Sequence, residues 1–298
     1  MLSMAVKRKI AAFMGICMII ATFVSGYDVS YADSNKENEY KSVVALTKSI
    51  ADMWMLSGGT LSGVTEDALE LDGISADVVN VGTMHKPSTE AILALKPDLV
   101  LLSGELAAHE QLKAELDELS VNANLITVDT FEDYDNMIRM FSEMNGREDL
   151  YQKNVTDVKE RIDSIISDAR DKYKGTSYLF IRASATKTKA LKKDHFACNI
   201  MDNLGLSNIA DDDSALNDLN IEEIALQDPD YIFVIFMGDD EEAAKSFSDE
   251  FESQAVFKEL KAVKENRLVF LPKDLFHNKP NARWDEAYKY VCDILEKQ

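Results

Sequence analysis

The stretch that decides the fold is Arg147 to Tyr173, REDLYQKNVTDVKERIDSIISDARDKY. Its apolar residues recur three or four positions apart with one five-residue step, at Leu150, Val155, Val158, Ile162, Ile165 and Ala169. This spacing places them on one face of an α-helix and leaves the other face charged. At about 1.5 Å per residue the helix would measure roughly 40 Å, which suits either a long surface helix of an α/β domain or a connector between two lobes.

Both ends of this stretch carry helix boundary signals. Asn145-Gly146 stops the preceding segment, and Glu148 and Asp149 lie where the positive end of the helix dipole favours acidic side chains. Gly175 follows the last basic turn, where we expect it to act as the C-cap. The sequence therefore predicts one uninterrupted helix.

An internal repeat lies on either side of the long helix. The two copies are Glu90-Ala-Ile-Leu-Ala-Leu-Lys-Pro-Asp98-Leu-Val and, 132 residues later, Glu222-Glu-Ile-Ala-Leu-Gln-Asp-Pro-Asp230-Tyr-Ile. In each copy a short helix ends before Pro-Asp, because the residue before a proline is pushed out of the α-helical region. Two copies around one helix favour two similar lobes joined by it, although two chance helix-strand units would look the same.

Short runs of Val, Leu and Ile alternate with helical stretches along the rest of the chain. Such runs are typical of strands buried on both faces of a parallel sheet. The predicted strands are 42–46, 78–81, 98–102, 125–128, 177–181, 231–236 and 268–270, and predicted helices include 48–56, 196–204 and 285–295. We therefore predict an α/β fold with two Rossmann-like lobes, each containing a mostly parallel sheet, joined by one long helix.

The N-terminus is typical of a secretory signal peptide. Lys7, Arg8 and Lys9 precede an apolar run to Val24, and the run is short for a membrane span. Val24-Ser25-Gly26 resembles the start of a bacterial lipobox, but Tyr27 stands where the lipid-accepting cysteine belongs. The expected organisation is a signal peptide at 1–26, a flexible polar tether at 27–40, an N-terminal lobe at 41–146, the connecting helix at 147–174 and a C-terminal lobe at 175–298.

Charge and cysteine content narrow the function further. The formal net charge is −21, and removing the signal peptide with its three positive charges and no acid makes it −24. Such a field repels phosphate backbones, which argues against nucleic acid as a partner. Cys198 and Cys292 are far apart, so a disulfide scaffold is not expected. The chain also lacks a nucleophile elbow, a Walker loop and a glycine-rich dinucleotide turn.

In these features the chain resembles the substrate-binding proteins of ABC importers, in the class with two Rossmann-like lobes and a single rigid connecting helix that handles iron-siderophores, haem and cobalamin. The resemblance rests on the order of Val81-Gly82 to Pro87, the two repeat copies, the long helix and LPKDLFHNKPNARW at 271–284. It implies an exported, monomeric binding protein without an intrinsic cofactor, which captures haem or a ferric siderophore and delivers it to an ABC permease. Cobalamin, a metal ion chelated directly by His85, His195 and His277, and a secreted hydrolase are the alternatives.

Ligands of open α/β sheets bind beyond the carboxyl ends of the strands. The loops at those ends supply the candidate ligand-binding residues, which are Thr83, Met84, His85, Lys86, Ser103, Gly104, Arg182, Lys187, Phe236, Met237, His277, Lys279, Arg283 and Trp284. They combine cations, aromatics and two types of iron ligand. A ferric siderophore would need only the cations and aromatics, because its own oxygens fill the iron shell.

Resemblance to haem-binding members implies more specific roles. His85 and Met237 fall near the positions of axial ligands, and His/Met is a sound axial pair for haem iron. Arg182, Lys187 or Lys279 would then meet the propionates. The resemblance also implies that Glu90 and Glu222 dock onto arginines of the permease, although a carboxylate in a first helical turn is favoured by the helix dipole in any case.

Overall fold

The computed structural model describes residues 40–211, 216 and 219–297. The predicted signal peptide and the tether before Tyr40 lie outside these residues. Within the described residues, no helix combines the length and the apolar character that crossing a membrane requires.

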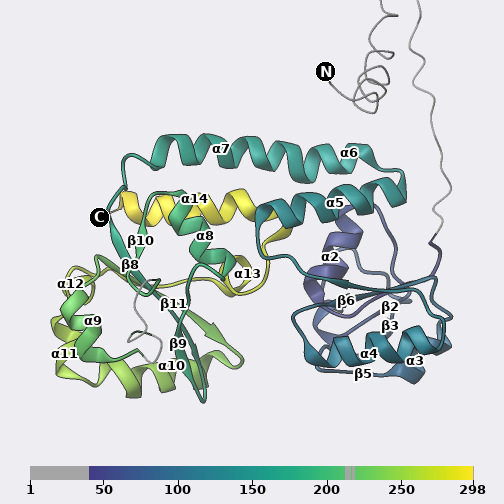
Figure 1. The fold of residues 1–298 in the computed structure, drawn as a ribbon, viewed down its shortest axis with the longest axis horizontal. Coiled ribbons are helices and arrows are strands. Elements are labelled where there is room, and N and C mark those ends of the chain that lie inside the picture. Colours follow the sequence, from purple (N-terminus) through teal and green to yellow (C-terminus); the bar gives the residue numbers. More distant parts are fainter. Residues whose placement is uncertain (1–39, 212–215, 217–218, 298) are drawn as a thin grey trace, which may run out of the picture. The chain divides into compact units, whose positions relative to one another are not determined.

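The N-terminal lobe is built on a parallel sheet in the order β3-β2-β1-β6-β7 (Figure 1). Its strands are β1 (Val43–Ala45), β2 (Gly63–Val64), β3 (Val79–Asn80), β6 (Leu99–Ser103) and β7 (Ala123–Ile126). Its helices are α2 (Lys48–Leu56), η1 (Glu66–Ala68), α3 (Thr89–Ala94), α4 (Ala107–Glu118) and α5 (Phe131–Asn145), and β4 (Gly82–Thr83) and β5 (Lys86–Pro87) form a separate hairpin. The central strands β1 and β6 are fully buried, as predicted.

The two edge strands of this sheet differ from the prediction. Val79 in β3 is 40% exposed and Leu125 in β7 is 41% exposed, because an edge strand has no neighbour to cover its outer side. The expectation that these runs are buried on both faces is therefore wrong, and the predicted 125–128 strand ends at Ile126.

The C-terminal lobe contains a second parallel sheet in the order β10-β8-β11-β12, with β9 antiparallel to β8. Its strands are β8 (Ser177–Ser184), β9 (Thr188–Ala190), β10 (Ser207–Asn208), β11 (Tyr231–Met237) and β12 (Leu268–Phe270). Its helical segments are α8 (Phe196–Asn203), α9 (Ile221–Gln227), α10 (Asp240–Phe247), η4 (Ser248–Glu252), α11 (Ala255–Glu259), α12 (Lys261–Lys264), α13 (Lys273–Phe276), η5 (Asn281–Arg283) and α14 (Trp284–Glu296). The predicted α/β fold with two mostly parallel sheets is confirmed.

The connecting helix is shorter than predicted and is interrupted. It consists of α6 (Glu148–Tyr151), a π-helical turn η2 (Gln152–Thr156) and α7 (Asp157–Ala169). It ends at Ala169, so Gly175, which has a φ of 86°, lies beyond it and is not its C-cap. Tertiary contacts accompany the π-turn, since the Asn154 amide donates to Leu56 O at 2.7 Å and the Asn154 carbonyl accepts from Tyr134 Oη at 3.1 Å.

The internal repeat is also a structural repeat. In both copies the residue before proline, Lys96 or Asp228, has a positive φ, and the aspartate after proline accepts a hydrogen bond from the backbone at the start of a neighbouring strand. Asp98 Oδ2 accepts from Ser42 N at 2.9 Å, and Asp230 Oδ2 accepts from Ser177 N at 2.9 Å. Each aspartate thus satisfies a backbone donor where β1 or β8 begins.

One hydrophobic core runs through both lobes. It joins side chains of β1, α2 and α5 to those of α7, α8, β8 and α14, and α7 packs along α14 (Figure 1). The chain returns to the N-terminal lobe near its end, where Asn281 binds Ser49 and Asp52 in α2 and the Trp284 ring lies 5.9 Å from that of Phe131. The long helix is therefore one of several links between the lobes.

Candidate functional site

The turn of the β4–β5 hairpin contains Met84 and His85, and Met84 lines a cavity between the lobes. Gly82 has a φ of 107°, and a Cβ there would lie 2.7 Å from Lys86 O, so only glycine fits this turn. The buried His109 fixes the hairpin, because its Nδ1 accepts from Ser103 N at 2.9 Å and its Nε2 donates to Met84 O at 2.8 Å. Burial lowers the pKa of His109, which keeps this tautomer neutral.

Two cations face each other on the β8–β9 hairpin of the C-terminal lobe. Arg182 and Lys189 are directly opposite in the antiparallel register, an arrangement that destabilises a sheet when the charges are alike. Burial, and for Lys189 also the neighbouring Arg182, lowers the pKa of each group. In the described parts of the chain, no hydrogen bond or ion pair engages the Arg182 guanidinium, although Asp194 favours its charged form from farther away. An unpaired, half-buried arginine beside a lysine is suited to an anion.

Two histidines lie close to these cations. His195 is the N-cap of α8, where its Nδ1 accepts from Ala197 N at 3.3 Å, so Nε2 carries the proton. Burial, followed by Lys279, Arg182, His277 and Lys189, lowers the pKa of His195 to about 3. His277 has a buried Nδ1 without a hydrogen-bond partner, and burial and Arg182 lower its pKa. We refer to Arg182, Lys189, His195 and His277 as the cationic site.

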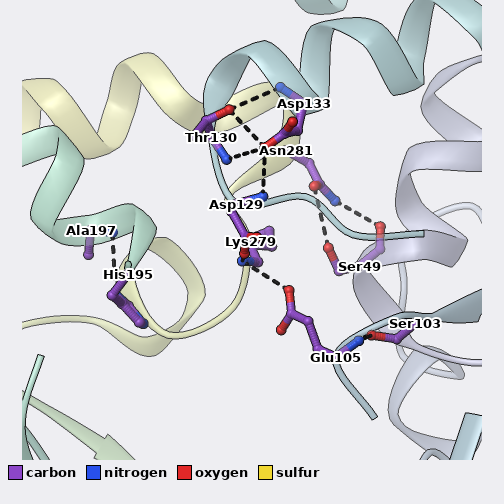
Figure 2. Close-up of polar contacts among 10 residues, drawn as sticks. All are labelled: Ser49, Ser103, Glu105, Asp129, Thr130, Asp133, His195, Ala197, Lys279 and Asn281. Carbon is purple, nitrogen blue, oxygen red and sulfur yellow. Dashed lines mark hydrogen bonds and ion pairs between the residues drawn. The ribbon is translucent and has the colours of Figure 1, made fainter. Parts of the chain in front are cut away.

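Lys279 lies at the border between this site and the N-terminal lobe (Figure 2). Its Nζ is 3.2 Å from Glu105 Oε1 and 3.4 Å from Asp129 Oδ1, and it lies 5.1 Å from the centre of the Phe196 ring. Its side chain is 16% exposed. Lys279 therefore joins the lobes. Its ammonium group, which the sequence suggested for ligand binding, contacts two acidic side chains of the N-terminal lobe.

An inter-lobe cavity of about 680 Å³ is lined by Lys279 together with residues of both lobes. It brings together Met84, Lys279 and Arg283 from the predicted set, but acidic side chains dominate its N-terminal wall, namely Asp52, Asp67, Glu70 and Asp72. Arg283 is held by Asp274 and Glu286, each at 2.8 Å. An anionic ligand is consequently favoured at the cationic site and disfavoured in this cavity.

The remaining candidates are not gathered into one cluster. Trp284 is 2% exposed and packs on Phe131 and Phe196, so it belongs to the core and offers no surface to a ligand. His85, Lys86 and Lys187 are exposed in turns, Thr83 and Gly104 are half-buried, and Ser103 is buried at the end of β6. Met237 is 37% exposed at the end of β11, and the neighbouring Phe236 packs on Phe270.

A directly chelated metal ion has no visible site. Within the described ranges, no three His, Cys, Asp or Glu side chains are grouped so that they could hold one. His109 uses both ring nitrogens for hydrogen bonds within the chain, whereas His195 uses only Nδ1 and keeps Nε2 available.

The two repeat glutamates occupy equivalent places. Glu90 and Glu222 are each the second residue of a short helix, α3 and α9, and both are exposed. The N-caps differ, since Ser88 Oγ accepts from Ala91 N and Asn220 Oδ1 accepts from Glu222 N and Glu223 N. Both carboxylates are free to meet a partner.

The structure has two lobes, each built on a mostly parallel sheet, and a helix links them. Cations lie near the carboxyl ends of the strands. This architecture is that of a two-lobed substrate-binding protein. The chain belongs to the periplasmic binding protein family, whose model matches residues 43–275. Members of this family are transport proteins rather than enzymes.

Relatives and solved structures agree with this assignment. The Fe(3+)-citrate-binding protein YfmC of Bacillus subtilis is 24% identical over 263 residues, which cover 86% of this chain and 80% of YfmC. Staphylococcus aureus IsdE complexed with heme superposes with a TM-score of 0.73 at 19% identity, covering 85% of this chain and 98% of IsdE. Staphylococcus aureus SirA complexed with staphyloferrin B gives a TM-score of 0.65 at 22% identity, covering 88% and 94%.

Sequence reasoning missed several residues of this site. Lys187 and Lys189 are two positions apart, and residues two positions apart in a strand have side chains on the same face of the sheet. This pattern could have suggested a lysine opposite Arg182, which in the structure is Lys189. Glu105 lies two residues after β6 and Asp129 three residues after β7, so both were recognisable as residues at the carboxyl ends of strands. His109 and Asn281 act through contacts with residues 25 and about 230 positions away, which no local pattern reveals.

Proposed function

We propose that this protein captures a negatively charged ferric complex with free carboxylate groups and delivers it to an ABC importer. The single observation that carries the proposal is the cationic site, where Arg182 lies opposite Lys189 and, in the described chain, makes no hydrogen bond or ion pair, although Asp194 favours the charged form of both groups from farther away. A like-charge pair that weakens the sheet is best explained by a ligand that neutralises it.

The chemistry of the site fits carboxylate recognition. Arginine binds a carboxylate through two parallel N–H···O bonds, and charge-assisted bonds of this kind are roughly twice as strong as neutral ones. The neutral His195 adds an Nε2 donor at the N-terminus of α8, where the helix dipole also favours an anion. The name of the relative YfmC, an Fe(3+)-citrate-binding protein, supports the same class of ligand.

Haem is the second candidate, because its propionates would also suit the cationic site. Met237 is 37% exposed at the end of β11 and His85 is exposed at the tip of the β4–β5 hairpin, so both side chains are accessible to iron. The relative named as the heme uptake protein IsdE, 22% identical over 296 residues, favours testing this ligand.

Delivery to an importer is the second half of the proposal. The exposed Glu90 and Glu222, at equivalent positions of the two lobes, are the side chains that we assign to permease arginines. Export is expected from the N-terminal sequence, and the name of the relative YhfQ, a substrate-binding lipoprotein, supports a location outside the cytoplasmic membrane.

Titration calorimetry with ferric citrate, a neutral ferric trihydroxamate and haemin tests the ligand class. We expect ferric citrate to bind and Arg182→Met to weaken it by about 10- to 100-fold, the equivalent of the ~1.5–3 kcal/mol of a charged hydrogen bond. Lys258→Met is the matched control, since it removes one exposed positive charge from α11 in the same lobe.

Two results would redirect the proposal. Preference for the neutral trihydroxamate, with no effect of Arg182→Met, would exclude carboxylate recognition. Saturable haemin binding with a sharp Soret band that His85→Ala shifts would establish the second candidate, whereas a shift on His277→Ala alone would show that the axial ligand comes from His277.

A further inference from the structure

Lys279 is the charged group that crosses between the lobes at the cleft. It comes from the loop after α13, whereas its two acidic partners lie in loops of the other lobe, Glu105 after β6 and Asp129 after β7. The backbone of both loops is fixed, because Glu105 N donates to Ser103 Oγ at 3.2 Å and Asp129 N donates to Asp133 Oδ2 at 3.1 Å. The two carboxylates therefore extend from ordered loops and are 48% and 52% exposed.

The ammonium of Lys279 also borders the cationic site. It lies 5.1 Å from the centre of the Phe196 ring, and the His195 ring stacks on Phe196 with 4.8 Å between centroids. Figure 2 shows Lys279 between His195 and Glu105. A positive charge in this position can serve the N-terminal acids or an anion at the cationic site, but it cannot fully neutralise both.

We propose that Glu105 and Asp129 compete with the ligand for Lys279. In the ligand-free protein the two carboxylates hold the ammonium across the cleft, and a carboxylate of the bound ligand takes their place. The inference rests on the proposed function, since only an anionic ligand can compete with these acids.

Such competition has a defined effect on affinity. A ligand that recruits Lys279 must displace contacts that the free protein already has, so the internal pair lowers the affinity for such a ligand by the free energy of those contacts. A ligand with several carboxylates can engage Arg182 and Lys189 while it recruits Lys279, and it therefore loses affinity to the pair. A small monovalent anion that binds Arg182 and Lys189 alone leaves the pair intact, so its affinity does not depend on Glu105 and Asp129.

The test compares Glu105→Gln, Asp129→Asn and the double variant by calorimetric titration with ferric citrate. We expect the double variant to bind about fivefold more tightly, the change that ~1 kcal/mol of lost ion pairing represents. Lys279→Met should bind more weakly than the wild type. In the Lys279→Met background the two acidic substitutions should no longer change the affinity, because the group that they compete for is absent.

Asp117→Asn is the matched control, since it removes one exposed acidic partner of a lysine, Lys113, from the same lobe. An equal gain in this variant would assign the effect to net charge and overturn the inference. Unchanged or weaker binding by the double variant would also overturn it, because the pair would then support the liganded state. Failure of the wild type to bind ferric citrate would instead refute the proposed function, and the inference with it.

Discussion

Replacing Asn281 by alanine should destabilise the protein strongly, although this residue lies outside both sheets. Asn281 is 2% exposed and has a φ of 51°, in the left-handed region that asparagine tolerates better than alanine. Its Nδ2 donates to Asp52 Oδ2 at 2.7 Å and to Ser49 O at 3.1 Å, which fastens the C-terminal segment to α2.

The size of the effect follows from these contacts. Loss of the bond to the Asp52 carboxyl group should cost about 1.5–3 kcal/mol and loss of the bond to the Ser49 carbonyl about 0.5–1.5 kcal/mol. Alanine in the left-handed region adds about 1 kcal/mol. We therefore expect the free energy of unfolding to fall by roughly 3–5 kcal/mol, and Asn281→Gly to lose about 1 kcal/mol less than Asn281→Ala because glycine adopts this φ freely.

Urea unfolding followed by circular dichroism measures this change, and Asn278→Ala is the control because Asn278 is an exposed neighbour in the same loop. A loss below about 1 kcal/mol in Asn281→Ala, no larger than an ordinary surface substitution, would refute the reasoning. It would mean that the contacts between the C-terminal segment and α2 contribute little to the folded state.

Three further predictions concern acid stability, closure and transport. Burial would raise the pKa of Asp230, but bonds from Lys261 and Ser177 outweigh it and hold the pKa below 3.8. The stability that Asp230 contributes should therefore be present above this pH and be lost as the pH falls below it, and Asp230→Asn should flatten that acid slope in thermal melts. Solution scattering should show little change in the radius of gyration on addition of ferric citrate, since one core joins the lobes, and a contraction of several ångströms would contradict this. Alanine at both Glu90 and Glu222 should leave ligand affinity intact and lower uptake by cells, and a loss of affinity would disprove the docking role.

The fold was accessible from the sequence because its signals are local. The proline that ends each repeat helix and the buried runs of β1 and β6 act over a few residues, and the structure has these elements where they were expected. The π-turn in the connecting helix could not be predicted in this way. It depends on Asn154 meeting Leu56, 98 positions earlier, and on the Tyr134 hydroxyl, which are contacts of the folded chain.

The candidate site was only partly accessible, for the same reason. The loops that follow the strands could be located, so Arg182, His277 and Lys279 could be named as candidates, and their roles stay predictions. The sequence does not determine these roles, because the ion-pair partners of a cation in the folded chain decide whether it is available to a ligand. Lys279 forms ion pairs with two acidic residues of the other lobe, whereas Arg182 lies opposite another cation, Lys189 on β9. Trp284 was a candidate that belongs to the core instead. The sequence alone does not distinguish an aromatic residue that lines a cleft from one that is buried in the core.

The distribution of charge explains why this site must be compact. The whole chain carries a formal charge of −21, which repels an anionic ligand at long range. At physiological ionic strength that repulsion is screened beyond about 8 Å, so a local group of cations can dominate once the ligand is near. Arg182 and Lys189 provide this local excess, and in our proposal Lys279 joins them when the ligand displaces Glu105 and Asp129. Burial strengthens the interaction of these cations with a ligand relative to exposed lysines. Under the proposed function, selectivity for a carboxylate ligand would therefore arise at contact distance and depend on how many of the three cations the ligand can engage together.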